Sequence, residues 1–326
     1  MTSTTQATEA SSPPATSLKG KPRPGDRNFA ATALGAGIFI LVILAAVTAF
    51  LLIQGVPGML ADPADAPTTL GQSANFWAYV WPLAFGTIWA SILALLFAVP
   101  LSIGIALFIS HYAHRSLAAV LGYVIDLLAA VPSVVYGLWG STVFAKAVVP
   151  IYAWLNANLG WIPLFAGQVS VTGRTILTAA MVLAVMVLPI ITAICREVFL
   201  QTPKLHEEAA LALGATRWEM IRMAVLPFAR PGIISGAMLG LGRALGETMA
   251  VAMVLSATGV VTIQLLTSTN PSTIPANIAL KFGEAGYGLN VNVLIGTGLV
   301  LFVVTFGVNA LARWIVSRRS EFSGAN

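Results

Sequence analysis

Charged residues are scarce in this chain: Asp, Glu, Lys and Arg make up 9% of its 326 residues, whereas hydrophobic residues make up 57%. Soluble domains carry about 25% charged residues, so this composition excludes an ordinary water-exposed surface. Cysteine is almost missing as well. The single Cys195 excludes an intrachain disulfide and a thiolate metal cluster, and its apolar neighbours indicate a small buried side chain.

Recognisable catalytic chemistry is also lacking. The chain has no Gly-x-x-x-x-Gly-Lys-Ser/Thr phosphate loop, so any ATP-driven work must come from a separate ATPase chain that binds the ATP. No serine–histidine–acid set and no acid pair occurs in a soluble segment, and we predict neither enzymatic activity nor a cofactor in this chain. His111 and His114 are spaced to share a helical face, but two ligands are too few for a metal site, and we predict none.

The chain contains long runs of apolar residues with few or no charges. Six of them reach the roughly 20 residues that a helix needs to cross a membrane. We therefore predict an all-α membrane protein with six transmembrane helices, over 29–53, 82–110, 117–141, 175–199, 231–256 and 291–316. The transmembrane domain would cover 29–316, with its core at about 82–316. Residues 1–28 are rich in Ser, Thr, Ala and Pro and predict a disordered tail, and 317–326 form a second, short tail.

The basic residues indicate how the chain lies in the membrane. The net charge is +5, but Lys and Arg lie at the ends of the apolar runs, which argues against nucleic acid as a partner. With the N-terminus inside, thirteen Lys and Arg lie on the cytoplasmic side and only three on the other side: Lys146, Arg174 and Lys281. Since cytoplasmic loops carry the excess of basic residues, both termini are predicted to be cytoplasmic.

The predicted cytoplasmic loop 200–230 has helix signals on both sides of a glycine. Gly214 is placed to end one helix, and Thr216 is placed to cap a second short one. Composition alone leaves open a plain helical surface loop. The loop resembles the EAA loop of ABC importer permeases at six positions: Glu208, Ala209, Ala210, Gly214, Leu226 and Pro227. The resemblance implies a coupling helix that docks into a cleft on a cytoplasmic ATPase.

The fifth predicted span carries a charged pair. Arg243 and Glu247 are spaced i,i+4 and share one helical face with three glycines, which let another helix approach closely: Gly232, Gly236 and Gly240. A charge deep in a membrane costs at least about 2.5 kcal/mol on insertion scales, so the pair needs a reason. It is either a structural salt bridge or an anion site, in which the carboxylate holds the guanidinium until an oxyanion replaces it. Asp126, the acid in the third predicted span, is interpreted as a structural or gating partner, since a carboxylate repels anions.

Two motifs point to a family. Residues 242–248, GRALGET in one-letter code, resemble the signature of phosphate-specific ABC transporter permeases, and residues 132–140, PSVVYGLWG, resemble the PstC branch. The resemblance implies a type I ABC importer permease fold in a bacterial plasma membrane, with Arg243 and Glu247 in the transport path. It also implies a PstA-like second permease, two PstB-like ATPases and an external PstS-like phosphate-binding protein. A sulfate or molybdate permease and an ion-coupled secondary transporter remain alternatives.

Overall fold

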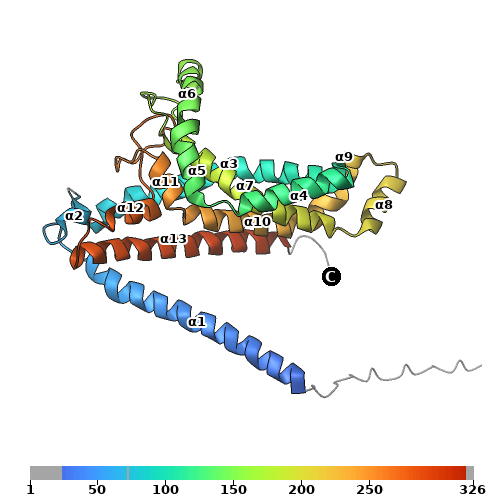
Figure 1. Ribbon diagram of the computed structural model, residues 1–326, viewed down its shortest axis with the longest axis horizontal. Coiled ribbons are helices and arrows are strands. Elements are labelled where there is room, and N and C mark those ends of the chain that lie inside the picture. The colour runs from blue at the N-terminus through green and yellow to red at the C-terminus, as the bar shows by residue number, and fades with distance from the viewer. Residues whose placement is uncertain (1–23, 72, 321–326) are drawn as a thin grey trace, which may run out of the picture. The chain divides into compact units, whose positions relative to one another are not determined.

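The computed structural model describes residues 24–71 and 73–320, and these residues form helices with no strand beyond an isolated bridge between Ala257 and Asn270 (Figure 1). Three π-helical segments, labelled η, lie within longer helical stretches. The elements in chain order are α1 (Pro24–Met59), α2 (Pro67–Leu70), α3 (Phe76–Leu107), η1 (Phe108–Tyr112), α4 (Arg115–Ala129), α5 (Ser133–Trp139), η2 (Gly140–Phe144), α6 (Ala145–Leu159), α7 (Ile176–Leu200), α8 (Lys204–Ala212), α9 (Arg217–Met220), η3 (Ile221–Val225), α10 (Leu226–Leu245), α11 (Met249–Val254), α12 (Ile274–Lys281) and α13 (Leu289–Ser320).

The chain divides into two units, residues 1–49 and 50–326. The described part of the first unit is the apolar N-terminal part of α1. This helix begins at Pro24, so the last residues of the predicted tail are helical. The rest of that predicted disordered tail, and the end of the predicted C-terminal tail, lie outside the described residues.

Six helical segments in the described part of the chain are long and apolar enough to cross a membrane, which confirms the predicted number. They are Asn28–Met59, Phe76–Tyr112, Ser133–Leu159, Ile176–Leu200, Arg217–Leu245 and Leu289–Trp314.

The third span differs from the prediction of 117–141. Helix α4 ends at Ala129, and Pro132 has extended backbone angles, φ −60° and ψ 140°. Proline has no backbone N–H and disfavours a helical conformation in the residue before it, so the helix is interrupted here. The apolar span is instead Ser133–Leu159, through α5, η2 and α6, and the start of the predicted outer loop at 142 is helical.

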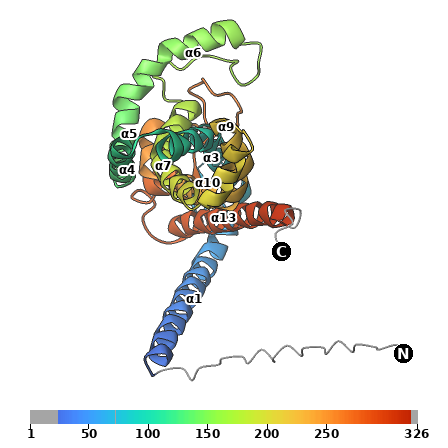
Figure 2. The same ribbon diagram turned by 90° about the vertical axis from the view of Figure 1, so that its right-hand side faces the viewer.

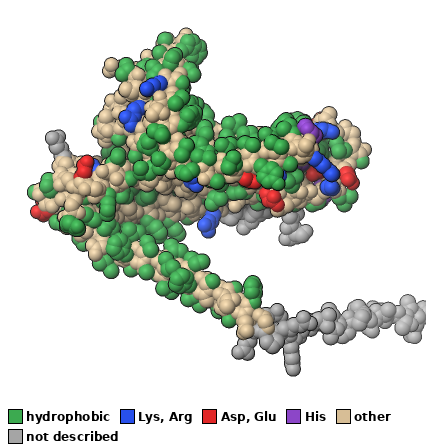
Figure 3. Space-filling model, viewed as in Figure 1, with side chains coloured by type: hydrophobic (Ala, Val, Ile, Leu, Met, Phe, Trp, Pro, Cys, Tyr) green, Lys and Arg blue, Asp and Glu red, His purple; other side chains and the backbone are tan. Residues whose placement is uncertain are grey.

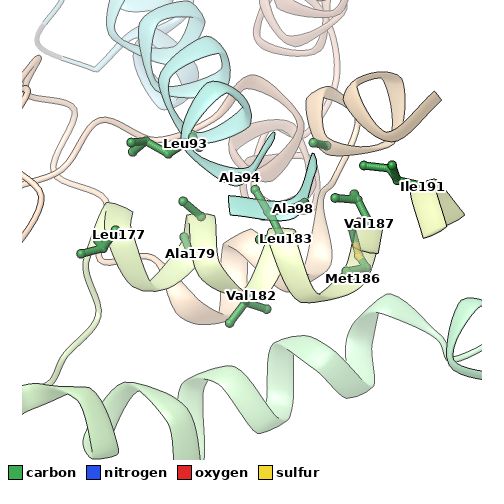
Figure 4. Close-up of a cluster of buried hydrophobic side chains, with 14 of the residues drawn as sticks. Leu93, Ala94, Ala98, Leu177, Ala179, Val182, Leu183, Met186, Val187 and Ile191 are labelled. Atoms are coloured by element: carbon green, nitrogen blue, oxygen red, sulfur yellow. The ribbon is translucent and has the colours of Figure 1, made fainter. Parts of the chain in front are cut away.

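Helix α7 is the centre of the second unit and the most buried of the six spans. Figures 1 and 2 show α3 and α10 beside it, and both are in direct contact with α7. In Figure 4 the small side chains of Ala94 and Ala98 on α3 lie beside Leu183 of α7. Because lipid is as apolar as leucine, such close packing through small residues holds membrane helices together.

The glycine stripe of α10 packs against α7. A Cβ atom added to Gly232 would lie 2.4 Å from Val198 Cγ2, and one added to Gly240 would lie 2.7 Å from Ile191 Cδ1. Any side chain at these positions would push the two helices apart. The expectation that the stripe admits a close neighbouring helix is confirmed.

The long segment between α11 and α12 is fixed by one buried amide. Asn270 is fully buried, and its Oδ1 accepts a hydrogen bond of 3.1 Å from the backbone N–H of Ile176 at the start of α7. Its Nδ2 donates to the carbonyl oxygens of Ser256, at 3.2 Å, and Thr267, at 3.0 Å. Asn270 thereby joins the start of α7 to the residues that follow α11.

Candidate functional site

The helix of the fifth span is broken beside the charged residues. Helix α10 ends at Leu245, and α11 begins at Met249. The i,i+4 spacing predicted that Arg243 and Glu247 lie on one continuous helix, and they do not. Glu247 is 8% exposed, and its Oε1 accepts a hydrogen bond of 3.0 Å from the backbone N–H of Ala250. The carboxylate therefore satisfies a free N–H group in the first turn of α11 and stabilises the restart of the helix.

Arg243, in the last turn of α10, lacks the predicted partner. The described residues contain one side-chain ion pair within 4.0 Å, and it joins His111 to Glu207. The predicted Arg243–Glu247 salt bridge is therefore wrong in this structure. The Nε atom of Arg243 is buried and has no hydrogen-bond partner among the described residues. An unpaired buried donor costs about 1–3 kcal/mol, so the guanidinium is ready to bind an acceptor.

Arg243 lines an open cleft of about 900 Å³ between α7, α10 and α13. A second cation, Arg313 of α13, lines the same cleft, together with the polar side chains of Ser235 and Asn309. The remaining lining is mainly apolar, and it contains no acidic residue. Two guanidinium groups with no carboxylate between them favour an anion, and a forked guanidinium matches the oxygens of an oxyanion. The sequence did not predict Arg313, because its position at the end of a span is typical of a topology signal.

Packing brings the two signature segments together. A Cβ atom added to Gly137 of α5 would lie 2.8 Å from the Cα of Ala250 in α11, so these short helices touch backbone to backbone. Tyr136, next to this contact, is within electrostatic range of Arg243. Its hydroxyl donates a hydrogen bond of 2.9 Å to the carbonyl oxygen of Leu128 in α4. The segment 132–140 therefore packs against α11, the helix that directly follows the segment 242–248, although more than 100 residues separate the two segments in the chain.

Asp126 lies elsewhere. It is exposed on α4, a 15-residue helix that is not part of the observed third span Ser133–Leu159. It lines a small separate pocket with Arg196, Gly122 and Tyr123, but no ion pair within 4.0 Å joins Asp126 to Arg196. A role in gating stays a prediction.

The loop between α7 and α10 follows its local signals. Helix α8 is followed by Gly214 at φ +86°, a left-handed conformation that favours glycine. Thr216 caps α9, and its side chain and that of Glu219 exchange hydrogen bonds with each other's backbone N–H groups. The predicted second short helix is instead the start of the continuous stretch Arg217–Leu245.

The predicted docking residues are divided between two sides of α8. Glu208, Ala209 and Gly214 are exposed, whereas Ala210 packs against the hydrophobic core. Figure 3 shows charged side chains gathered at the end of the molecule that carries α8 and α9, whereas hydrophobic side chains cover much of the surface between. This end is the part of the described chain best suited to water.

These features define a multi-pass helical membrane protein with a cationic cleft beside a broken span. The profile of the family described as "Binding-protein-dependent transport system inner membrane component" matches residues 98–321, more than half of the chain. The chain belongs to this family of transport subunits.

Known proteins match this chain over most of its length. The chain is 46% identical over 303 residues to the phosphate transport system permease protein PstC 2 of Mycobacterium tuberculosis, covering 90% of this chain and 92% of the relative. It is 44% identical over 283 residues to the permease protein PstC of Mycobacterium leprae, covering 83% and 86%. A crystal structure of a bacterial ABC transporter involved in the import of the acidic polysaccharide alginate aligns with a TM-score of 0.60 at 20% identity, over 90% of this chain and 96% of the other. The predicted ABC importer permease fold is confirmed.

Proposed function

We propose that this chain is the phosphate-conducting permease subunit of an ATP-driven importer in a bacterial plasma membrane. The guanidinium of Arg243 in the cleft carries the proposal, because a cation with a buried, unpaired Nε and no carboxylate partner favours an anion. Phosphate is the proposed anion, because the relatives at 46% and 44% identity are named as phosphate permeases.

The geometry favours a simpler cycle than the competition between anion and carboxylate that the i,i+4 spacing suggested. Glu247 is engaged with the first turn of α11, so an arriving oxyanion does not have to displace it from Arg243. The phosphate oxygens would accept hydrogen bonds from the free N–H groups of Arg243. The buried carboxylate nearby would weaken that attraction enough to permit release, since like charges repel strongly where water is excluded. Arg313, which lines the same cleft, would receive the anion next.

The cleft is open, so one chain provides only one wall of a path. We propose a second, PstA-like permease as the opposite wall, and an external phosphate-binding protein as the source of phosphate. Two PstB-like ATPases would bind and hydrolyse the ATP on the side of α8, with both termini of this chain on that cytoplasmic side.

Exposed apolar side chains around α8 support an ATPase contact. Leu205 is 73% exposed, Leu213 is 90% exposed and Trp218 is 55% exposed, beside the exposed carboxylate of Glu208. Apolar groups in a loop outside the membrane are typical of a surface that a partner covers. Glu208, Ala209, Ala210 and Gly214 are therefore the proposed coupling residues, although Ala210 contributes by packing inward.

Uptake by the complete complex tests the proposal. The tagged chain is purified with its three kinds of partner and reconstituted in vesicles that contain ATP. The phosphate-binding protein and radioactive phosphate are added outside, and phosphate accumulation in the vesicles is measured. We expect ATP-dependent uptake that excess phosphate blocks and excess sulfate does not. Arg243→Gln should abolish uptake, whereas Arg115→Gln, the same change at an exposed arginine away from the cleft, should not. Preferential uptake of sulfate, or normal uptake by Arg243→Gln, would contradict the proposal.

A further inference from the structure

The one ion pair in the described part of the chain joins two segments that the sequence keeps far apart. Nε2 of His111, in η1 at the end of the second span, lies 3.6 Å from Oε1 of Glu207 in α8. The two side chains are only 9% and 23% exposed. The pair therefore lies under the loop rather than on its surface.

The imidazole of His111 is held from two other sides. Its Nδ1 lies 2.7 Å from Oγ of Ser110, and that hydroxyl also donates to the carbonyl oxygen of Ala106 at 2.8 Å. The edge of the ring packs on Phe199, a fully buried residue near the end of α7, at 6.5 Å between ring centroids. The ring is thus fixed to the second and fourth spans and points its free nitrogen at α8.

The two neighbouring acids of α8 face different ways. Glu207 is half-buried against His111, and Ala210, three residues later on the same helical face, packs against the core. Glu208 is exposed, about 100° further round the helix. One acid is therefore available to a partner, and the other is committed to the chain's own membrane domain.

The contact also reaches a different span from the rest of the loop. The main backbone neighbours of α8 are α9 and η3, which begin the fifth span. Glu207 adds a contact to η1, the π-helical end of the second span, and α3 of that span packs along α7. Short π-helical segments are rare and frequently occur at functional sites, so η1 is a suitable place for a helix end to shift.

We propose that Glu207 is a positioning residue that ties α8 to the second span through His111, so that movement of α8 reaches the α3–α7 core as well as the fifth span. This inference rests on the proposed function for the meaning of that movement. It separates Glu207 from the predicted docking residue Glu208: loss of the first leaves the ATPase bound but poorly coupled, whereas loss of the second weakens its binding.

A double-mutant cycle in the reconstituted complex tests the link. The measured quantity is the phosphate taken up per ATP hydrolysed. It is compared among Glu207→Gln, His111→Gln and the double variant, with Glu208→Gln, the same change at the neighbouring position, as the control. Each single variant should lower this ratio about fivefold with the ATPase retained, in the range of ordinary coupling effects. The double variant should be no worse than either single, and exchanging the two residues, His111→Glu with Glu207→His, should restore part of the ratio. Additive losses, or a wild-type ratio in Glu207→Gln, would overturn the proposal.

Hydrogen exchange separates this inference from the proposed function. In the purified full-length chain, without the ATPase and without any phosphate, Glu207→Gln should speed amide exchange in 204–212 and Glu208→Gln should not. If this pattern holds while the wild-type complex imports no phosphate, the link stands and the proposed function fails. If uptake is normal but exchange in α8 is unchanged by Glu207→Gln, the link is wrong and the proposed function stands.

Discussion

Replacing Arg243 by glutamine removes the guanidinium from the cleft between α7, α10 and α13 and keeps a polar side chain there. Two charge-assisted hydrogen bonds to an oxyanion contribute about 1.5–3 kcal/mol each. Losing both therefore costs at least about 3 kcal/mol, which is more than a hundredfold in binding. We expect phosphate uptake at sub-saturating concentration to fall by at least that factor. Arg243→Lys keeps the charge but not the fork, and should lose about tenfold.

The melting temperature of the variant distinguishes an anion-binding role of Arg243 from a structural role. Nε of Arg243 is buried without a partner, so the folded protein already bears the penalty of an unsatisfied donor. Glutamine places a neutral amide there in place of the charged guanidinium, so the Arg243→Gln variant should melt at about the wild-type temperature or slightly above it. A structural salt bridge would give the opposite result, a lower melting temperature together with poor assembly.

The assay combines uptake by the reconstituted complex with thermal unfolding of the purified chain in detergent. The reasoning is refuted if Arg243→Gln imports phosphate within twofold of the wild type. It is refuted equally if uptake and melting temperature fall together in every Arg243 variant, since the residue would then act through the fold.

Three further predictions concern the scaffold, and thermal unfolding measures each of them. Asn270→Ala leaves buried backbone groups unpaired and should destabilise the chain by about 2–4 kcal/mol; a change below 0.5 kcal/mol would contradict the role assigned to this amide. Gly240→Leu places atoms where Ile191 Cδ1 already lies and should cost about 1–3 kcal/mol, whereas Gly242→Ala, with open space around it, should be nearly neutral. Thr216→Ala removes the capping box of α9 and should cost about 0.5–2 kcal/mol, with faster exchange confined to the first turn of that helix; a loss spread over α10 would argue for a wider role.

Features that depend on neighbours in the chain were predicted well. The turn at Gly214 and the cap at Thr216 follow from backbone freedom and from one side-chain oxygen, and both are present. The break before the third span also had a local signal in Pro132, but the apolar residues around it favoured one continuous helix. Pro100 and Pro189 lie inside continuous helices of the same structure, so a proline alone does not predict where a membrane helix ends.

Features that join distant segments could not be predicted. The spacing of Arg243 and Glu247 predicted an ion pair on one helix, but the break at 246–248 turns the carboxylate to the backbone of α11 instead. The shared cleft of Arg243 and Arg313 and the contact between His111 and Glu207 join residues some 70 to 100 positions apart. No spacing rule relates such residues, since packing alone decides which helix faces meet.

By itself, the sequence determined that this protein crosses a membrane about six times as helices, because the bilayer requires roughly 20 apolar residues in a row and that is a local property of the chain. It also determined the glycine stripe that brings α10 against α7. Only the tertiary structure decided which charged groups are paired, because each guanidinium or carboxylate finds its partner, or lacks one, through the arrangement of helices far apart in the sequence. The unpaired guanidinium of Arg243 and the pairing of Glu207 with His111 are both results of that arrangement.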